Sequence, residues 1–437
     1  MDFKPLFEKA KARGVEALQV HHESLEEINF DVFKGDLDKH KLANTERLVI
    51  KGIVDGKMGE TTTERIHEAY ADEWVQAIID SAKAVESEDE VFIYEGDSSY
   101  PELEGLKNAD LDRFDNEEKQ RLTFDLEKKV KALDERIDIS QAFFGESKKR
   151  VHLINSKGLN LERKVHSAIL GASVVVREDD DTRDAFEYIQ SNVFDDFDLD
   201  AIAEDVVQRA TSLLGAKAIP SGTYDIVLEN RASANLLQTF AGMFNAESVQ
   251  KGMSKLKGKI GDVIAAEELS VVDDPFRAKS TKSATFDDEG VATSRKRVID
   301  EGKLSTYLYD LKTAAKDNTE STGNAFSGNI SPTNFYIEPG NLSFEDAKAS
   351  LDKGLIITSL QGLHSGANPV SADFSLQASG YYVENGEIQK AVSLITVSGN
   401  YLSFLQQVVN ICDDLRFNFS YVGSPSLYIK DVVISGT

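Results

Sequence analysis

The 437-residue chain is long enough for two to four domains, and its 75 acidic and 49 basic residues give a formal net charge of −26. Such a charge repels polyanions, so nucleic acid and anionic membranes are excluded as general partners. The single cysteine, Cys412, excludes an internal disulfide and favours a reducing compartment. The first residues lack the apolar core of a signal peptide, and no apolar run approaches the ~20 residues of a membrane helix. We therefore expect a cytoplasmic protein.

The first half of the sequence repeats one order of predicted elements, strands followed by a helix. Residues 2–13 form an amphipathic helix, and alternating segments then predict strands up to the hairpin turn at Asp55 and Gly56. A helix with one apolar stripe follows. After an acidic, turn-rich stretch come a charged helix and three strand candidates, residues 136–147, 149–165 and 167–179, and then another helix. We predict two units of sheet plus helix, residues 1–110 and 111–219.

The second half is dominated by strands with turn signals. Pro220 and Gly222 mark the boundary of a larger unit, residues 220–437. A helix is predicted over residues 230–249, a second after the Ser343 cap, and a third over residues 400–415. The whole chain is therefore predicted to be α+β, with mainly antiparallel sheets covered by helices.

Short motifs for catalysis or metal binding fail on spacing. His21 and His22 are adjacent on a predicted strand, so they point to opposite faces and cannot share a metal. The segment that begins at His67 lacks the second histidine of a His-Glu-x-x-His zinc motif. Ser254 and Lys257 match Ser-x-x-Lys, but the accompanying Lys-Thr-Gly element is absent.

One histidine stands out by its surroundings. His364 lies in a long loop rich in Gly, Ser, Asn and Pro, where functional residues concentrate. The alternative is that His364 only hydrogen-bonds the loop.

Residues 221–275 resemble the C-terminal core of the TldD/PmbA family, also called the modulator of DNA gyrase family. Residues 373–400 resemble its glycine-rich closing strands, and residues 424–436 its last strand. The resemblance implies a TldD-like version, with a zinc-binding His-Glu-x-x-x-His helix and peptidase activity, and a PmbA/TldE-like version that lacks the motif and pairs with the first.

This sequence resembles the second version. Aligned on the segment 236–243, the first His of the motif falls on Gln238, the Glu on Thr239 and the second His on Met243, whereas Gly242 is kept. Ligands five residues apart lie about 140° apart on a regular helix, so the motif needs a distorted helix, which a glycine would ease. Gln and Met are poor ligands for zinc, and Thr cannot act as a general base. The resemblance also implies a C-terminal cysteine in the zinc site of the active version. Cys412 lies in about that region of this chain, but one thiol alone would not hold zinc. We expect Cys412 to be a buried thiol.

The resemblance therefore implies a zinc-less subunit of a metallopeptidase complex that acts on unfolded or small peptides. Zinc would be held by a TldD-like partner, and no cofactor is expected in this chain. Gly362, His364, Ser365 and Ser371 are candidates for the wall of a peptide chamber, with edge-strand addition as the binding mode.

Two other functions stay open. The chain could be a homodimeric peptide-binding or scaffold protein without peptidase activity. It could also be an enzyme with another nucleophile, such as Ser254 or His364, although no base-and-nucleophile pair is evident.

Overall fold

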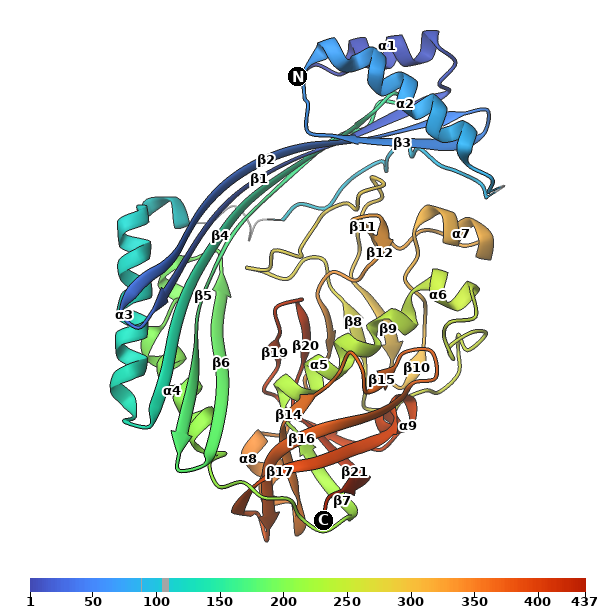
Figure 1. Cartoon of the computed structure of the whole chain (residues 1–437). Helices are drawn as coiled ribbons and strands as arrows, with labels where there is room; N and C mark the ends of the chain where they lie inside the picture. The colour runs from blue at the N-terminus through green and yellow to red at the C-terminus, as the bar shows by residue number, and fades with distance from the viewer. Residues whose placement is uncertain (88, 104–109) are drawn as a thin grey trace.

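A computed structural model describes residues 1–87, 89–103 and 110–437. It confirms the α+β class, with mainly antiparallel sheets and covering helices (Figure 1). The acidic stretch in which we placed the first domain boundary lies partly outside the described residues.

A curved, fully antiparallel sheet of six strands forms the N-terminal half, in the order β3-β2-β1-β4-β5-β6. Its strands are long because apolar and polar residues alternate over most of their length. The strands are β1 (Ala17–Phe33), β2 (Asp36–Val54), β3 (Lys57–Thr63), β4 (Ile137–Asn155), β5 (Asn160–Glu178) and β6 (Asp181–Ser191).

Helices cover this sheet at its two ends, and each end has its own core. At one end lie α1 (Lys4–Ala12) and α2 (Ala71–Ala84), where Trp74 and Ile78 pack with strand residues. At the other end lie α3 (Asn116–Leu133) and α4 (Leu199–Thr211) on the outer face, so the inner face is left to the C-terminal domain (Figure 1). Tyr100, after α2, contacts the C-terminal domain, because its hydroxyl donates to the Gly290 carbonyl.

Five strands of the C-terminal domain close into a small barrel. They are β14 (Lys353–Gln361), β7 (Gly222–Leu228), β21 (Leu427–Ser435), β17 (Glu387–Asn400) and β16 (Asp373–Glu384), and β14 also pairs with β16. Two short strands flank the barrel, β15 (Ala367–Asn368) on β16 and β18 (Val408–Ile411) on β21. Closure leaves these five strands with few unpaired edges.

A second, irregular sheet packs opposite the barrel, and helix α5 (Asn230–Phe240) lies between the two. Residues of α5 and of both sheets share the largest core. The strands of the second sheet are, in order, β10 (Lys303–Leu304), β9 (Lys296–Asp300), β8 (Val271–Asp273), β13 (Phe335–Ile337), β20 (Val422–Ser424) and β19 (Arg416–Phe417), and β11 (Ala325–Phe326) pairs separately with β12 (Asn329–Ile330).

Shorter helices complete the described chain. The α-helices are α6 (Ala246–Gln250), α7 (Leu311–Asp317), α8 (Phe344–Ala349) and α9 (Tyr401–Gln406), and 3₁₀ turns span Glu68–Tyr70, Leu111–Arg113, Phe194–Asp196 and Ala241–Phe244. The predicted Ser343 cap is confirmed, because its hydroxyl accepts from the Asp346 amide.

Three element predictions were wrong. The three strand candidates after α3 are two long strands, because a turn at residues 156–159, with Gly158 at a φ of 108°, splits the middle candidate. The helix predicted over 400–415 ends at Gln406, since β-branched Val408 and Ile411 pair with β21 instead. The helix predicted over 230–249 is three pieces: α5, a 3₁₀ turn and α6.

The predicted units 1–110 and 111–219 share one sheet. β1 of the first pairs with β4 of the second along fifteen residue pairs, from Gln19 opposite Asn155 to Phe33 opposite Gln141. The three-domain division stays a prediction, and the shared sheet fixes the two N-terminal units relative to each other.

The contact of α2 with β3 depends on a glycine. A Cβ at Gly59 would lie 2.0 Å from the Ile78 carbonyl oxygen, a backbone atom that cannot rotate away. We predict that Gly59→Ala lowers the free energy of unfolding by about 1–3 kcal/mol, the usual cost of overpacking, measured by urea denaturation. The control is Gly242→Ala, whose added carbon meets no atom within 4 Å and should change stability by less than about 0.5 kcal/mol. Equal losses in the two variants would contradict the predicted contact.

Candidate functional site

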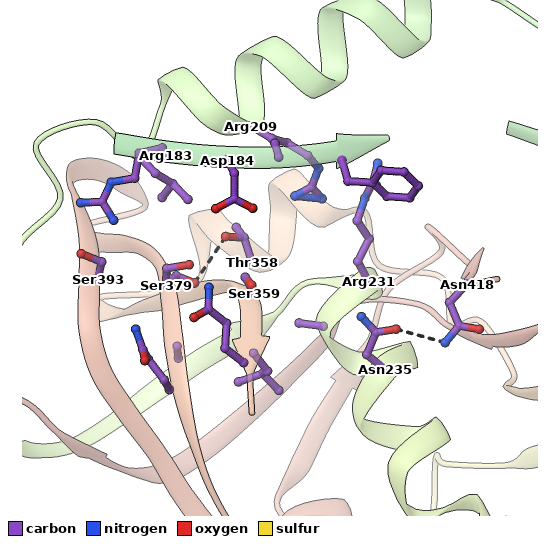
Figure 2. A pocket seen from close by; sticks show the side chains of 18 of the residues that line it. Arg183, Asp184, Arg209, Arg231, Asn235, Thr358, Ser359, Ser379, Ser393 and Asn418 are labelled. Carbon is purple, nitrogen blue, oxygen red and sulfur yellow. Dashed lines mark hydrogen bonds between the residues drawn. The ribbon is translucent and has the colours of Figure 1, made fainter. Parts of the chain in front are cut away.

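A cavity with a volume of about 550 Å³ lies where β6 faces the C-terminal domain. β6 is an edge strand, so one side of its backbone is unpaired in the sheet. Figure 2 shows Arg183 and Asp184 of β6 on one side, and Arg231 and Asn235 of α5 on another. The remaining walls come from α4, β14, β16, β17 and residues 416–419; the lining includes Arg209, Leu213, Thr358, Ser359, Gln361, Gln377, Ser379, Ser393, Leu394 and Asn418.

A network of ion pairs centred on Glu187 joins four elements at the base of this cavity. Glu187 of β6 is 2% exposed and pairs with Arg231 of α5 and Arg416 of β19. Arg231 also pairs with Asp205 of α4 at 2.5 Å. We call Glu187, Asp205, Arg231 and Arg416 the Glu187 network.

A second buried pair extends the network. Arg209 of α4 donates two hydrogen bonds to the carboxylate of Glu229, the residue just before α5. Its Nη2 lies 2.6 Å and its Nη1 3.3 Å from the two carboxylate oxygens. Burial raises the pKa of Glu229 and of Glu187, against the opposing effect of the nearby guanidinium groups. Charges this well buried are stable only while they stay paired, so the network fixes the positions of β6, α4 and α5.

Stacked aromatic rings bind β6 to the loop between β19 and β20. The rings of Tyr188 and Phe419 stack with centroids 3.7 Å apart, and Phe186 lies 5.4 Å from both Phe419 and Phe143. Phe186 is 40% exposed and Phe419 46% exposed. The cavity therefore has an apolar lip next to its charged base.

The chemistry of the lining favours binding over bond cleavage. The described lining residues include no histidine, cysteine or lysine, so its serines lack the imidazole or amine base that usually activates a nucleophile. The Asp184 carboxylate points into the cavity (Figure 2). An unpaired strand edge, small hydroxyl side chains and an apolar lip suit an extended chain with its backbone groups exposed.

The three motif positions on and after α5 have structural roles. The Gln238 side chain accepts from Asn418 Nδ2 at 2.6 Å and donates to Ser420 Oγ at 2.9 Å, which ties α5 to the β19–β20 loop. The Thr239 hydroxyl donates to the Asn235 carbonyl one turn earlier. Met243 is 1% exposed within the C-terminal core.

These residues do not fit a zinc ion. The Met243 side chain packs into the core, whereas Gln238 is exposed and already hydrogen-bonded, so they do not converge on one point. Cys412 is fully buried in a different apolar cluster, and burial raises the pKa of its thiol to about 12, which keeps it protonated at neutral pH. Neutral thiol, amide and thioether groups are weak ligands for zinc.

The alternative nucleophile Ser254 is also structural. It is 6% exposed and its hydroxyl donates to the Met243 carbonyl at 2.8 Å. Gly252, Gly258 and Gly261, in the segment around Ser254, all have positive φ and no neighbour within 4 Å of an added Cβ, so they serve turns.

The proposed chamber-wall residues lie together on one loop outside the cavity. His364 is exposed, Ser365 Oγ donates to the Gly362 carbonyl, and Ser371 ends the loop before β16. None of the four lines the cavity, although Gln361 next to them does. Their contact with a peptide stays a prediction.

Within the described ranges, one group of three possible metal ligands comes together elsewhere, at Asp112, Glu146 and His166. Lysines already neutralise its carboxylates, because Lys119 lies 2.5 Å from Glu146 and Lys148 pairs with Asp112. His166 Nε2 lies 2.7 Å from Glu146. We interpret this group as a buried ion-pair network that attaches α3 to the sheet.

Sequence reasoning missed the cavity, although one signal was present. In β16 the buried residues Phe374, Leu376 and Ala378 alternate with polar Ser375, Gln377 and Ser379. Such alternation predicts a polar face turned to solvent. Gln377 and Ser379 on that face line the cavity instead. The cavity exists only because β6 lies opposite them, and the sequence around β16 does not encode that position.

Comparison with known proteins gives the family. Residues 221–436 match the PmbA/TldA metallopeptidase C-terminal domain, and residues 109–214 match the central domain of the same family. This chain belongs to the PmbA/TldD family. The resemblance expected from the sequence is thereby confirmed.

Relatives match nearly the whole PmbA/TldD-family chain. The uncharacterized protein MJ0231 of Methanocaldococcus jannaschii is 28% identical over all of both chains. The metalloprotease PmbA homolog of Haemophilus influenzae is 26% identical over 92% of this chain and 88% of its own.

Solved structures share the fold of the PmbA/TldD-family chain. A candidate modulator of a DNA gyrase from Thermotoga maritima superposes with a TM-score of 0.92 at 32% identity, over 99% of this chain and 98% of the other. TldE from Thermococcus kodakarensis superposes with a TM-score of 0.90 at 23% identity, over 99% and 100%, and supports the fold alone. Among the residues that the structure describes, no helix has both the length and the apolar character needed to cross a bilayer.

Removing the Glu187 carboxylate should destabilise the protein. We predict that Glu187→Ala lowers the free energy of unfolding by about 1–3 kcal/mol, because it leaves the partly exposed guanidinium groups of Arg231 and Arg416 without their shared buried partner. Urea denaturation measures the loss. Asp184→Ala, on the exposed side of the same strand, is the control and should change stability by less than about 0.5 kcal/mol. A similar small change for Glu187→Ala would show that the network contributes no stability.

Proposed function

We propose that this chain is a PmbA/TldE-like subunit, without zinc of its own, of a cytoplasmic TldD/TldE-type metallopeptidase complex. The observation that carries the proposal is the state of helix α5. The motif positions hold Gln238 and Thr239, whose side chains form hydrogen bonds within the protein, and Met243, which packs in the core. Other residues of the helix line the cavity of about 550 Å³. In this proposal the chain supplies a binding wall and a TldD-like partner supplies zinc and cleavage.

The proposed substrate is an unfolded or small peptide in an extended conformation. The cavity offers the unpaired edge of β6 and, across from it, the hydroxyl groups of Thr358, Ser359 and Ser379. Hydrogen bonds to a peptide backbone are independent of its sequence. The charges at the base are balanced within the Glu187 network, so they give little preference for an acidic or a basic peptide.

The partner is either a TldD-like chain or a second copy of this chain. In the first case the complex cleaves peptides, and in the second the protein binds peptides without cleaving them. The name of one relative, metalloprotease PmbA homolog, favours the first.

Zinc content tests the subunit assignment. After dialysis against excess zinc and then buffer, we predict less than about 0.1 zinc per isolated chain, because Gln, Thr and Met replace the ligands that zinc prefers. Elemental analysis measures the ratio. One zinc per chain that is lost in Gln238→Ala would contradict the proposal, whereas Lys255→Ala, in the loop after α6, is the control for nonspecific binding.

Filling the cavity tests the peptide site. Ser379 lines the cavity and Ser375, on the same face of β16, does not. With a TldD-like partner, we predict that Ser379→Trp raises the KM for an unstructured peptide at least about tenfold because the indole occupies the cleft. Ser375→Trp should change it less than about twofold.

The outcomes separate the two functions. Unchanged KM in Ser379→Trp would remove the cavity from the peptide site. Peptide binding to the isolated chain, with no cleavage in the presence of any TldD-like partner, would favour the binding-only homodimer.

A further inference from the structure

A second cavity, of about 340 Å³, lies at the other end of the long sheet, away from β6. Its walls come from β1, β2, β3, residues after α2, residue 289 and the start of α7. The segment after α2 runs between the sheet and the C-terminal domain in this region (Figure 1). No contact of the proposed peptide site involves it, so the cavity needs its own explanation.

A buried acceptor points to a ligand in this cavity. Gln19 is 6% exposed and lines the cavity. Its Nε2 donates to the Asp288 carbonyl at 3.2 Å, whereas its Oε1 is buried without a hydrogen-bond partner among the described residues. Buried acceptors of this kind are rarely left unpaired, because each costs the free energy of its lost hydration.

A carboxyl group lines the same cavity. Glu289 follows the Asp288 whose carbonyl accepts from Gln19, and its own carboxylate accepts from the Leu311 amide at 2.9 Å. Burial raises the pKa of Glu289 to about 7, and the nearby charges of Asp310 and Asp288 act in the same direction. An amide oxygen and a carboxylate that line one cavity both accept hydrogen bonds, and a primary ammonium group supplies donors for both.

Within the described residues Glu289 forms no ion pair, and the other charged side chains around the cavity are hydrogen-bonded, ion-paired or exposed, which favours Glu289 as the ammonium partner. Asp89 pairs with Lys312 at 3.0 Å, and Asp310 accepts from the Thr313 amide at the start of α7. Lys57 donates to the Val85 carbonyl at 2.5 Å, and Glu90 is exposed. Lys51 lies 3.5 Å from Glu60 at the rim, and its charge also acts on Glu289.

Apolar side chains form the rest of the wall. Met58, Val91, Phe92 and Ile93 line the cavity, and Ile93 is only 3% exposed. A cavity of about 340 Å³ is at the lower end of the range for small-molecule sites. It suits one or two amino-acid residues and excludes a longer folded segment.

We propose that this cavity binds an α-ammonium group attached to an apolar side chain, with the ammonium held by Gln19 Oε1 and the Glu289 carboxylate. Two sources carry this chemistry: a free amino acid such as leucine, and the first residue of a short peptide. A free amino acid would also place its carboxylate near Lys51. The site is independent of the proposed peptidase function, since it shares no lining residue with the first cavity.

Acetylation of the amine tests the site on the wild-type protein. By isothermal titration calorimetry at pH 7.5, we expect L-leucine and the dipeptide Leu-Gly to bind, and N-acetyl-L-leucine to bind at least about tenfold more weakly. Leucine binding more tightly than Leu-Gly would identify the free amino acid as the ligand, and the reverse order a peptide terminus. At pH 6, where Glu289 holds its proton, the affinity of both should fall. Equal binding of the acetylated and free compounds, or no binding of either free amine at 10 mM, would overturn the proposal.

Two variants locate the site. Glu289→Gln keeps the acceptor for the Leu311 amide but removes the charge, and should weaken leucine binding at least about tenfold. Gln19→Met keeps the side-chain length without the acceptor and should also weaken it. Glu86→Gln, at an exposed position between Val85 and Ser87 that does not itself line the cavity, is the control and should leave the affinity within about twofold. Circular dichroism and thermal melts establish that each variant is folded, and unchanged affinity in folded Glu289→Gln would place the ligand elsewhere.

Discussion

The buried Glu187 carboxylate is the interaction on which the arrangement of the molecule depends. It lies on an edge strand of the N-terminal sheet, and its two arginine partners belong to helix α5 and strand β19 of the C-terminal domain. A charge buried to this degree is tolerated only when it is paired. The pairing therefore sets the position of the sheet edge relative to α5, and this position creates the cavity between them.

In the proposed function, helix α5 keeps the position of a metal site without its chemistry. The Gln238 amide hydrogen-bonds to the β19–β20 loop, and that loop carries Phe419 to the aromatic rings of β6. Met243 packs in the C-terminal core. The side chain of Gln238 thus supports the wall of the cavity.

Local pattern predicted the elements of this fold well and their association poorly. The apolar stripe of α2, the Ser343 cap and the turn at Asp55–Gly56 were all readable because each depends on neighbours in sequence. The pairing of β1 with β4 joins residues more than 100 positions apart, and no local signal encodes it. The candidate site has the same origin: Glu187, Arg231 and Arg416 are ordinary surface-type residues in sequence and become one buried network only in the folded chain.

The central claim is that this chain contributes a peptide-binding wall and leaves metal chemistry to a partner. The most direct test is a crystal structure of the chain in complex with a TldD-like partner and a slowly cleaved peptide, with zinc located by anomalous scattering. The account predicts an extended peptide along β6, close to Ser379, and zinc bound only to residues of the partner. Zinc bound against α5 of this chain, or a peptide that avoids the cavity, would contradict it.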